Sequence, residues 1–319
     1  MALYLGLDTS NYTTSIAIYD TSQKQVFQAK KLLPVKSGQK GLRQSDAVFH
    51  HIVQLPEVLE ELNISGKEIS GIGVSVVPRN VEKSYMPCFL CGESTAKMLG
   101  HVLTIPVYKT SHQTGHILAG LYSAKKLAWR KQKFLAFHVS GGTTDCVICE
   151  PNKDYILNIK NISSSLDLKA GQLIDRVGIM LGLNFPCGKE LEQLAIQSNK
   201  KFNYKPVMKG LACCMSGLEN QCAKMYQDKM PACDIAMFCL TAIAEILKKM
   251  TSLVLKQEQE NNLPVLYVGG VMSNQYIQKQ LTEYFYSKTE TAFAEPAYSC
   301  DNAVGTAVYA AIHGSPNCF

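Results

Sequence analysis

The chain has 319 residues, of which 46% are apolar and 18% are charged, and its formal net charge is +6. This length fits two domains of about 150 residues each, and the apolar content is sufficient for two cores. It excludes a small domain that depends on disulfides for its stability. The mild positive charge permits an anionic partner such as RNA or a nucleotide without requiring one.

No run of about 18 apolar residues occurs, so the sequence predicts no membrane span. The opening residues, MALYLGLDTSNYTT, lack a basic region and become polar at Asp8, which does not fit a signal peptide. Twelve cysteines in a chain of this length, without an export signal, are expected to be reduced thiols. We therefore expect a cytoplasmic protein with no membrane association.

Hydrophobic periodicity predicts strands alternating with helices, which is typical of a mixed α/β fold. Expected helices cover residues 46–62, 92–100, 111–122, 168–182, 189–198, 231–258, 273–286 and Asp301 to His313. Expected strands cover residues 71–77, 103–108 and 264–269, with two hairpins at residues 5–20 and 134–150.

The two hairpin segments resemble each other. Ser10 aligns with Ser140, and Thr13 and Thr14 align with Thr143 and Thr144, at an offset of 130 residues. Each segment is an apolar strand, a tight turn of small residues and a second alternating strand. Such a turn can direct backbone N–H and hydroxyl groups at a phosphate. The pair indicates two copies of one domain, each opening with a hairpin.

This repeat gives the expected domain boundaries. Residues 1–130 form an N-terminal lobe, and residues 300–319 are a candidate to pack back against it. Residues 131–319 form a C-terminal lobe with a helical insertion at about residues 165–230. A metal and nucleotide site is expected between the lobes.

The segment His112-Gln-Thr-Gly-His116 places two imidazoles four residues apart in an expected helix. Positions i and i+4 share one helix face, so both side chains can bind one ion. The spacing resembles that of zinc peptidases, but Gln113 stands where those enzymes have a glutamate base. Peptidase chemistry by that route is therefore disfavoured.

Asp301 begins the last expected helix. One interpretation is that its carboxylate only caps that helix. The other is that it completes a set of two histidines and one carboxylate, which leaves metal positions open for substrate oxygens.

Two further segments have both a structural and a functional interpretation. Residues 268–274 run from a buried strand through Gly-Gly into a helix, which could direct backbone groups and a helix N-terminus at an anion. Asp167, Gly171 and Asp175 are spaced about one helical turn apart. They could contact a ribose or base, or they could form a solvent-exposed helix face.

The Cys88/Cys91 and Cys146/Cys149 pairs are expected to serve mainly in packing, since no second pair completes a zinc site.

Six ordered blocks resemble one known family: HQTGH, VSGGT, DLKAGQLIDRVGIMLGLNFPCG, CMSGLEN, GGVMSN and SCDNA. The chain is similar over nearly its whole length to the glycoproteases (O-sialoglycoprotein endopeptidases, peptidase family M22). The best-understood members of that family are the tRNA N6-adenosine threonylcarbamoyltransferases. The resemblance implies an α/β, two-lobed actin/hexokinase-like (ASKHA) fold with a duplicated ribonuclease H-like domain.

The resemblance also implies site residues. A divalent metal, iron or zinc, would be bound by His112, His116 and Asp301. An adenine nucleotide or acyl-adenylate substrate would be bound by His138, Val139, Ser140, Gly141, Gly142, Asp175, Gly188 and Asn274. Asp8 or Asp175 would orient or deprotonate the acceptor amine.

The implied reaction is transfer of a threonylcarbamoyl group from threonylcarbamoyl-AMP to N6 of the adenosine next to the tRNA anticodon. Implied partners are tRNA, a related non-catalytic subunit and an ATPase subunit.

The chain departs from the family pattern around the substrate. No acidic pair follows Ser10, Thr143 stands where the family has His or Asn, residues 77–80 replace a Gly-Pro-Gly loop, and Cys187 replaces a glycine. The departures favour a diverged paralogue. The alternatives are therefore an enzyme acting on another carbamoyl or phosphate substrate, or a nucleotide-binding scaffold.

Overall fold

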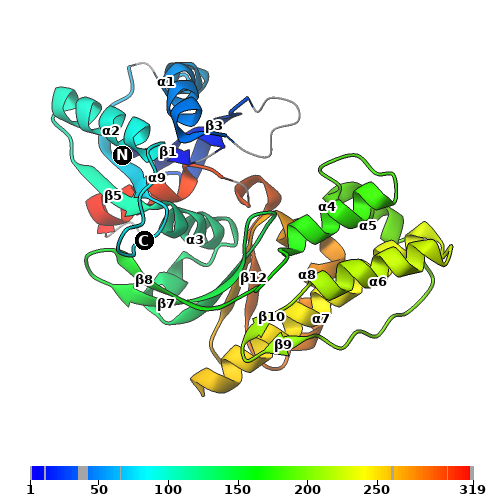
Figure 1. The fold of residues 1–319 in the computed structure, drawn as a ribbon. Coiled ribbons are helices and arrows are strands. Elements are labelled where there is room, and N and C mark those ends of the chain that lie inside the picture. Colours follow the sequence, from blue (N-terminus) through cyan, green and yellow to red (C-terminus); the bar gives the residue numbers. More distant parts are fainter. Residues whose placement is uncertain are drawn as a thin grey trace. The chain divides into compact units, whose positions relative to one another are not determined.

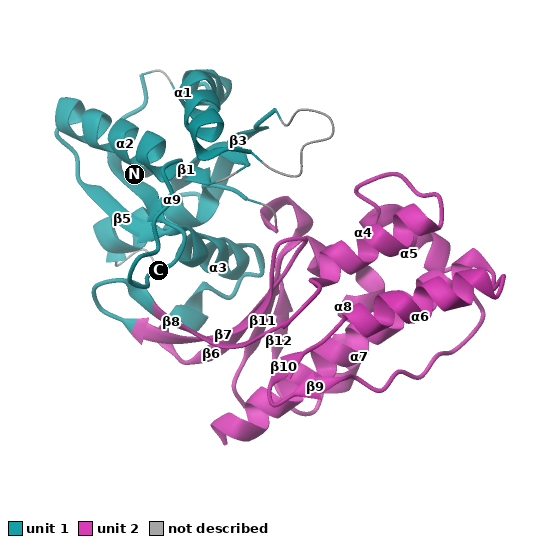
Figure 2. Cartoon of the chain, viewed as in Figure 1, with its two compact units in different colours: residues 1–130, 152–157, 300–319 teal, residues 131–151, 158–299 magenta. Residues whose placement is uncertain are grey.

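The computed structural model describes residues 2–10, 12–34, 42–64, 66–259, 262–299 and 301–316 (Figure 1). The chain divides into two compact units (Figure 2). Unit 1 comprises residues 1–130, 152–157 and 300–319, and unit 2 comprises residues 131–151 and 158–299.

The sheet of unit 1 has the strand order β3-β2-β1-β4-β5. Its strands are β1 (Leu3–Ser10), β2 (Thr13–Asp20), β3 (Gln25–Leu32), β4 (Ile69–Val77) and β5 (Val107–Ser111). The hairpin predicted at residues 5–20 is confirmed, with β1 antiparallel to β2 and Leu7 opposite Ile16. Strand β4 runs parallel to β1, and β5 runs parallel to β4.

The described helices of unit 1 are α1 (Gln44–Glu61), α2 (Phe89–Leu103), α3 (His112–Ser123), the 3₁₀ turn η1 (Leu127–Lys131) and α9 (Val304–Gly314). Helix α9 packs against β1, β4 and α3. Glycines make this close approach possible: a Cβ atom at Gly6 or Gly73 would overlap the α9 backbone. The last helix thus lies directly on the sheet that carries β1.

The sheet of unit 2 has the strand order β12-β11-β6-β7-β8. Its strands are β6 (Phe134–Val139), β7 (Thr144–Asn152), β8 (Ile156–Ser164), β11 (Val265–Val268) and β12 (Thr291–Phe293). Strands β6 and β7 are antiparallel, while β11 is parallel to both β6 and β12. Read from the opposite edge, the order is β8-β7-β6-β11-β12, which corresponds strand by strand to β3-β2-β1-β4-β5 in unit 1. The two sheets therefore have the same strand order, as the matching hairpins predict.

The remaining elements are α4 (Ala170–Met180), α5 (Gly188–Ala195), the short strands β9 (Met208–Lys209) and β10 (Ala212–Cys213), α6 (Ser216–Gln227), α7 (Ala232–Glu258), η2 (Gly270–Ser273), α8 (Gln275–Phe285) and η3 (Pro296–Tyr298). Helix α7 contacts α4, α5, α6 and α8, which explains why apolar residues surround it on most sides. No helix in the described ranges is long and apolar enough to cross a membrane.

Several sequence expectations were wrong in detail. The strand expected at residues 103–108 is β5 at Val107–Ser111, because α2 continues to Leu103 and ends at the left-handed Thr104, whose φ is 55°. Asp301 does not cap α9: that helix begins at Val304, whose N–H donates to Oδ1 of Asn302.

Candidate functional site

The two histidines of the HQTGH segment occupy the first turns of α3. Strand β5 ends at Ser111, whose hydroxyl oxygen accepts a hydrogen bond from the N–H of Thr114 and so caps the helix. Because the helix starts at His112, the side chain of His116 lies one turn further on the same face. The two Nε2 atoms are 2.9 Å apart.

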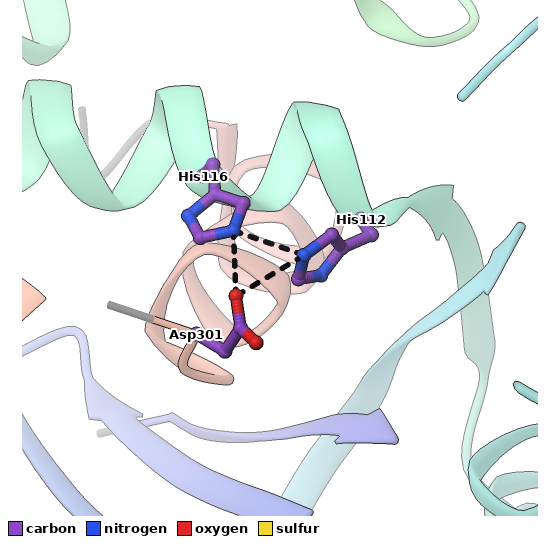
Figure 3. Close-up of side chains that lie close together, drawn as sticks. All are labelled: His112, His116 and Asp301. Atoms are coloured by element: carbon purple, nitrogen blue, oxygen red, sulfur yellow. Dashed lines mark hydrogen bonds and ion pairs between the residues drawn. The ribbon is translucent and has the colours of Figure 1, made fainter. Parts of the chain in front are cut away.

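Asp301 reaches the same point through the crossing of α3 and α9. Gly115 and Gly305 face each other there, and a Cβ atom at Gly305 would overlap the carbonyl group of Gly115. This contact brings Oδ1 of Asp301 to 3.2 Å from Nε2 of His116 and 3.5 Å from Nε2 of His112. Figure 3 shows the three side chains converging.

This donor set fits a divalent transition metal. Nitrogen and carboxylate ligands bind zinc at about 2.0–2.2 Å, which places neighbouring ligand atoms about 3.0–3.5 Å apart. The separations among His112, His116 and Asp301 are 2.9, 3.2 and 3.5 Å. Two imidazoles with one carboxylate suit iron or zinc better than calcium or magnesium.

Asp8 lies behind the triad and contacts His112 directly. Its Oδ2 atom is 2.9 Å from Nδ1 of His112, and its Oδ1 atom accepts from the N–H of Ser10 at 2.9 Å. The carboxylate is buried. Burial acts to raise its pKa, but the charge and hydrogen bond of His112 hold the pKa of Asp8 below its usual value. Asp8 therefore stays ionised and orients the imidazole of His112.

The charges of the triad are strongly coupled. Burial alone would lower the pKa of His112, but the carboxylates of Asp8 and Asp301 raise that pKa to about 10. Burial acts to raise the pKa of Asp301, and the hydrogen bonds from the two histidines hold it well below the usual range. The pocket thus stabilises one positive charge between two carboxylates, a role that a bound cation also fills.

In unit 2, the loop after β6 carries the glycines expected to hold a nucleotide. His138 and Val139 end the strand. The hydroxyl group of Ser140 accepts from the N–H groups of Gly142 and Thr143, which closes the turn. A Cβ atom at Gly141 or Gly142 would have no neighbour within 4 Å, so the space above these two glycines is open.

Helix α4 packs its first turn on this loop. The N–H of Gly171 donates to the carbonyl oxygen of Ser140 at 3.1 Å, and a Cβ atom at Gly171 would come within 2.5 Å of the backbone nitrogen of Gly141. One turn later, Oδ1 of Asp175 accepts from the N–H of Cys187 at 2.9 Å. This bond places Asp175 beside Gly188, the first residue of α5.

Asn274 lies at the start of α8 and caps it: its Oδ1 atom accepts from the N–H of Ile277 at 2.9 Å. Glu192, on α5, accepts from the N–H groups of Gln275 and Tyr276 at 2.6 and 3.1 Å. The expectation that this helix N-terminus is available to an anion does not hold in this conformation, because a carboxylate already occupies these donors. Sequence analysis missed Glu192, since only tertiary packing brings α5 to α8.

Asp167 has a different role from the one its spacing suggested. It precedes α4 and accepts from the N–H groups of Leu168, Met215 and Ser216, so it caps the start of α6 rather than sharing a face with Asp175. The thiol of Cys88 is buried among apolar residues, and this burial raises its pKa to about 12. That value fits the packing role expected for Cys88.

The structure thus joins the predicted residues into two groups. Unit 1 contains His112, His116 and Asp301 with Asp8 behind them. Unit 2 contains the loop at residues 138–142, linked by hydrogen bonds to α4 and, separately, Asp175 linked to α5. The expectation that both groups face one cleft stays a prediction.

A sequence model of the tRNA N6-adenosine threonylcarbamoyltransferase family matches residues 36–308. The chain belongs to this family. It is 29% identical to the tRNA N6-adenosine threonylcarbamoyltransferase of Thermosipho melanesiensis, over 96% of this chain and 93% of that protein. It is 28% identical to the corresponding protein of Thermosipho africanus, over 94% of this chain and 91% of the relative.

Solved structures share the fold at low sequence identity. Full-length HypF in its phosphate- and nucleotide-bound form matches with a TM-score of 0.61 and 14% identity, over 99% of this chain but only 46% of HypF. The activator of 2-hydroxyisocaproyl-CoA dehydratase from Clostridium difficile matches with a TM-score of 0.54 and 14% identity, over 99% of this chain and 96% of that one. These likenesses confirm the actin/hexokinase-like fold class.

Proposed function

We propose that this chain transfers a threonylcarbamoyl group from threonylcarbamoyl-AMP to N6 of the adenosine next to the tRNA anticodon. The observation that carries the proposal is the convergence of His112, His116 and Asp301 in a chain that belongs to the corresponding transferase family. The relatives at 28–29% identity carry the same activity in their names.

The proposed reaction is an acyl transfer. The N6 amine attacks the carbonyl carbon of the mixed anhydride, a C–N bond forms, and the bond from that carbon to the AMP oxygen breaks. The proton lost by N6 goes to a base, and AMP leaves with the electron pair. A divalent metal, iron or zinc, held by the triad would polarise the acyl or phosphate oxygens.

Asp8 is proposed as a positioning residue rather than the base. Both of its oxygens already accept hydrogen bonds, from His112 and from Ser10, and its carboxylate is buried. Its role is to hold the Nδ1–H of His112, so that the Nε2 lone pair points into the triad. Asp175 is less buried and remains the candidate to deprotonate the amine.

The nucleotide is proposed to bind at the loop from His138 to Gly142, together with Asp175, Gly188 and Asn274. Open space above Gly141 and Gly142 supports this, since a phosphate group can approach the backbone closely there. Asn274 would have to serve the ligand while it caps α8, which its free amide nitrogen permits.

A second candidate is a paralogue that acts on another carbamoyl or phosphate substrate. The observation that favours it is the loop after β4, where the chain departs from the family. The carbonyl group of Pro78 accepts from the N–H of Gln113, within the metal-binding segment itself. Tyr85 and Val81 on this loop are 62% and 61% exposed. A changed loop in this position would alter which substrates can approach the triad.

Partners and location stay proposals. A tRNA substrate follows from the proposed reaction. The related non-catalytic subunit, the ATPase subunit and a cytoplasmic location are expected from the resemblance alone.

Mass spectrometry of tRNA nucleosides tests the proposal directly. Purified, metal-loaded protein is incubated with unmodified tRNA and threonylcarbamoyl-AMP, with and without candidate partner subunits. Threonylcarbamoyladenosine should form and should be lost in Asp301→Ala. Formation of a different adduct when carbamoyl-phosphate or carbamoyl-AMP is supplied, with no threonylcarbamoyladenosine under any condition, would favour the paralogue.

A further inference from the structure

A groove in unit 2 lies at the C-terminal ends of α7, which is yellow to gold in Figure 1, and of α8, which is orange. Its volume is about 580 Å³. The polar lining residues that matter here are Ser252, Lys256, Tyr284, Ser287 and Lys288. Among the described residues, no aspartate or glutamate lines it. The groove contains none of the residues assigned to the metal or nucleotide.

Lys288 is held in place by an aromatic ring. Its ammonium nitrogen lies 3.4 Å from the centroid of the Tyr284 ring and 5.8 Å from that of Phe285. A cation over a ring face is attracted by the negative face of the ring and keeps its charge. The groove therefore has a preorganised positive charge.

The hydroxyl group of Tyr284 adds an oriented polar group. Its hydrogen bond with Ser252 lowers the pKa of Tyr284, an effect that outweighs burial and is reinforced by Lys288. Side-chain hydroxyl groups next to two ammonium groups are a combination that suits phosphate oxygens.

Two of the acidic residues near these helix ends, Glu258 and Glu245, have close partners, whereas Glu283 of α8 makes only a 3.9 Å pair with Lys279. Glu258 pairs with Lys133 at 2.9 Å, and Glu245 pairs with Lys248 at 2.8 Å. Neither carboxylate is therefore left to neutralise Lys256 or Lys288. The favourable interaction of Lys256 with the C-terminal end of the α7 dipole explains that one lysine, but not two cations in a groove whose described lining residues include no carboxylate.

An exposed aromatic side chain adjoins the groove. Tyr286 directly follows α8 and its side chain is 88% exposed, two residues from Lys288. Basic side chains interleaved with exposed aromatic rings are typical of surfaces that bind RNA, where cations contact phosphates and rings stack on bases.

We propose that this groove binds the phosphate backbone of RNA through Lys256 and Lys288, with Tyr286 as a stacking surface. The proposal deepens the proposed function and rests on it, because it names a surface for an RNA substrate outside the residues that perform the transfer.

Binding of a fluorescein-labelled RNA stem-loop, measured by anisotropy over a series of salt concentrations, tests the groove. Removing one cation that binds a phosphate should reduce the slope of log affinity against log salt by about one. The Lys256→Ala/Lys288→Ala variant should therefore reduce that slope by about two, and Lys288→Arg should keep it. Tyr286→Ala should weaken binding without changing the slope.

Lys229→Ala is the matched control, since it removes one exposed charge from unit 2 outside the groove. An unchanged slope in the double variant, or a reduction of about one in the control, which removes a single charge, would overturn the proposal. If tripolyphosphate binding is lost in the Lys256→Ala variant but RNA binding is not, the assignment to RNA would be overturned. Because the readout is binding, its failure is distinguishable from failure to form threonylcarbamoyladenosine.

Discussion

The Nδ1 atom of His112 lies 2.9 Å from Oδ2 of Asp8, so a carboxylate on the first strand orients an imidazole 104 residues further along the chain. This contact determines which nitrogen of His112 is free. Without a metal, the pKa of about 10 keeps His112 protonated on both nitrogens; when a cation displaces the Nε2 proton, the Nδ1 proton shared with Asp8 leaves the Nε2 lone pair directed at His116 and Asp301. The first strand therefore contributes to the triad without supplying a ligand.

The first prediction concerns this contact. Asp8→Asn keeps the size of the side chain but removes its charge, so the metal affinity should fall by about 10- to 100-fold. Competition with a chromogenic chelator measures the affinity. Asp20→Asn is the matched control, because Asp20 is a buried carboxylate that caps a turn after β2 through Ser22. Equal affinities in parent and Asp8→Asn would show that Asp8 has no influence on the triad.

The second prediction is that His112, His116 and Asp301 bind one divalent metal per chain. Elemental analysis of purified protein should give about one equivalent, and the His112→Ala/His116→Ala double variant should retain almost none. His101→Ala, in α2, removes an exposed histidine outside the triad and should keep the full equivalent. Full retention in the double variant would rule out this site.

The two hairpins and most of the helices followed from local sequence, but β3, β8, β12 and α6 were not predicted, and neither were most contacts of the site. Alternating apolar residues in the two hairpins predicted the strands that centre each sheet. Strand β3 was missed, because its edge position leaves Gln25, Phe27 and Leu32 exposed and mixes polar with apolar residues.

In the candidate site too, local geometry was predictable from the sequence, whereas contacts between distant segments were not. The spacing of His112 and His116 predicted their shared helix face, since that depends only on helix geometry. The cap at Asp301 was predicted wrongly, because α9 begins at Val304 with Ala303 as its N-cap, and the carboxylate of Asp301 contacts the two histidines instead. Glu192 gave no local signal, since its partners lie 83 and 84 residues away on α8.

A third prediction separates the structural and ligand-binding roles of Asn274. Asn274→Ser keeps an N-cap acceptor but is too short to reach a ligand, so the free energy of unfolding should change little while affinity for adenine nucleotides falls. Asn274→Ala should also destabilise the protein, by about 1 kcal/mol. Isothermal calorimetry with AMP and urea unfolding measure the two effects.

Gly142→Val provides a second test of the same site. A Cβ atom there meets no neighbour within 4 Å, so the variant should fold normally. Bulk above the loop should nevertheless block a phosphate. Unchanged calorimetric affinity in both Asn274→Ser and Gly142→Val would mean that these positions are structural only.

The fourth prediction concerns acid stability. Burial acts to raise the pKa of Asp167, but hydrogen bonds from Met215, Ser216 and Leu168 outweigh it and lower the pKa to about 2. A folded-state pKa below the unfolded value of about 3.9 contributes stability above pH 4, which is lost as pH falls from about 4 towards 2. Urea midpoints should therefore differ between parent and Asp167→Asn at pH 6, and the difference should shrink from about pH 4 and vanish only below about pH 2. A difference that does not depend on pH would contradict this origin.

The last prediction is that the protein has no peptidase activity, despite the older name of the family it resembles. Metal-assisted peptide hydrolysis needs an activated water and a base within hydrogen-bonding distance to take its proton. In peptidases with two histidines at this spacing, the base follows the first histidine on the ligand helix. Gln113 occupies that position, and an amide cannot accept a proton near neutral pH.

Asp8 is the remaining carboxylate that could act as the base. Among the described residues outside the triad, it alone contacts the imidazole of His112. Its oxygens are engaged by His112 and Ser10, so it is not free to serve a water molecule. The decisive assay uses metal-loaded protein with unstructured peptides and glycoproteins. Cleavage that persists at constant specific activity through purification, and disappears in His112→Ala, would overturn this prediction. Trace cleavage that survives in His112→Ala would instead identify a contaminating protease, since the triad would then be unnecessary.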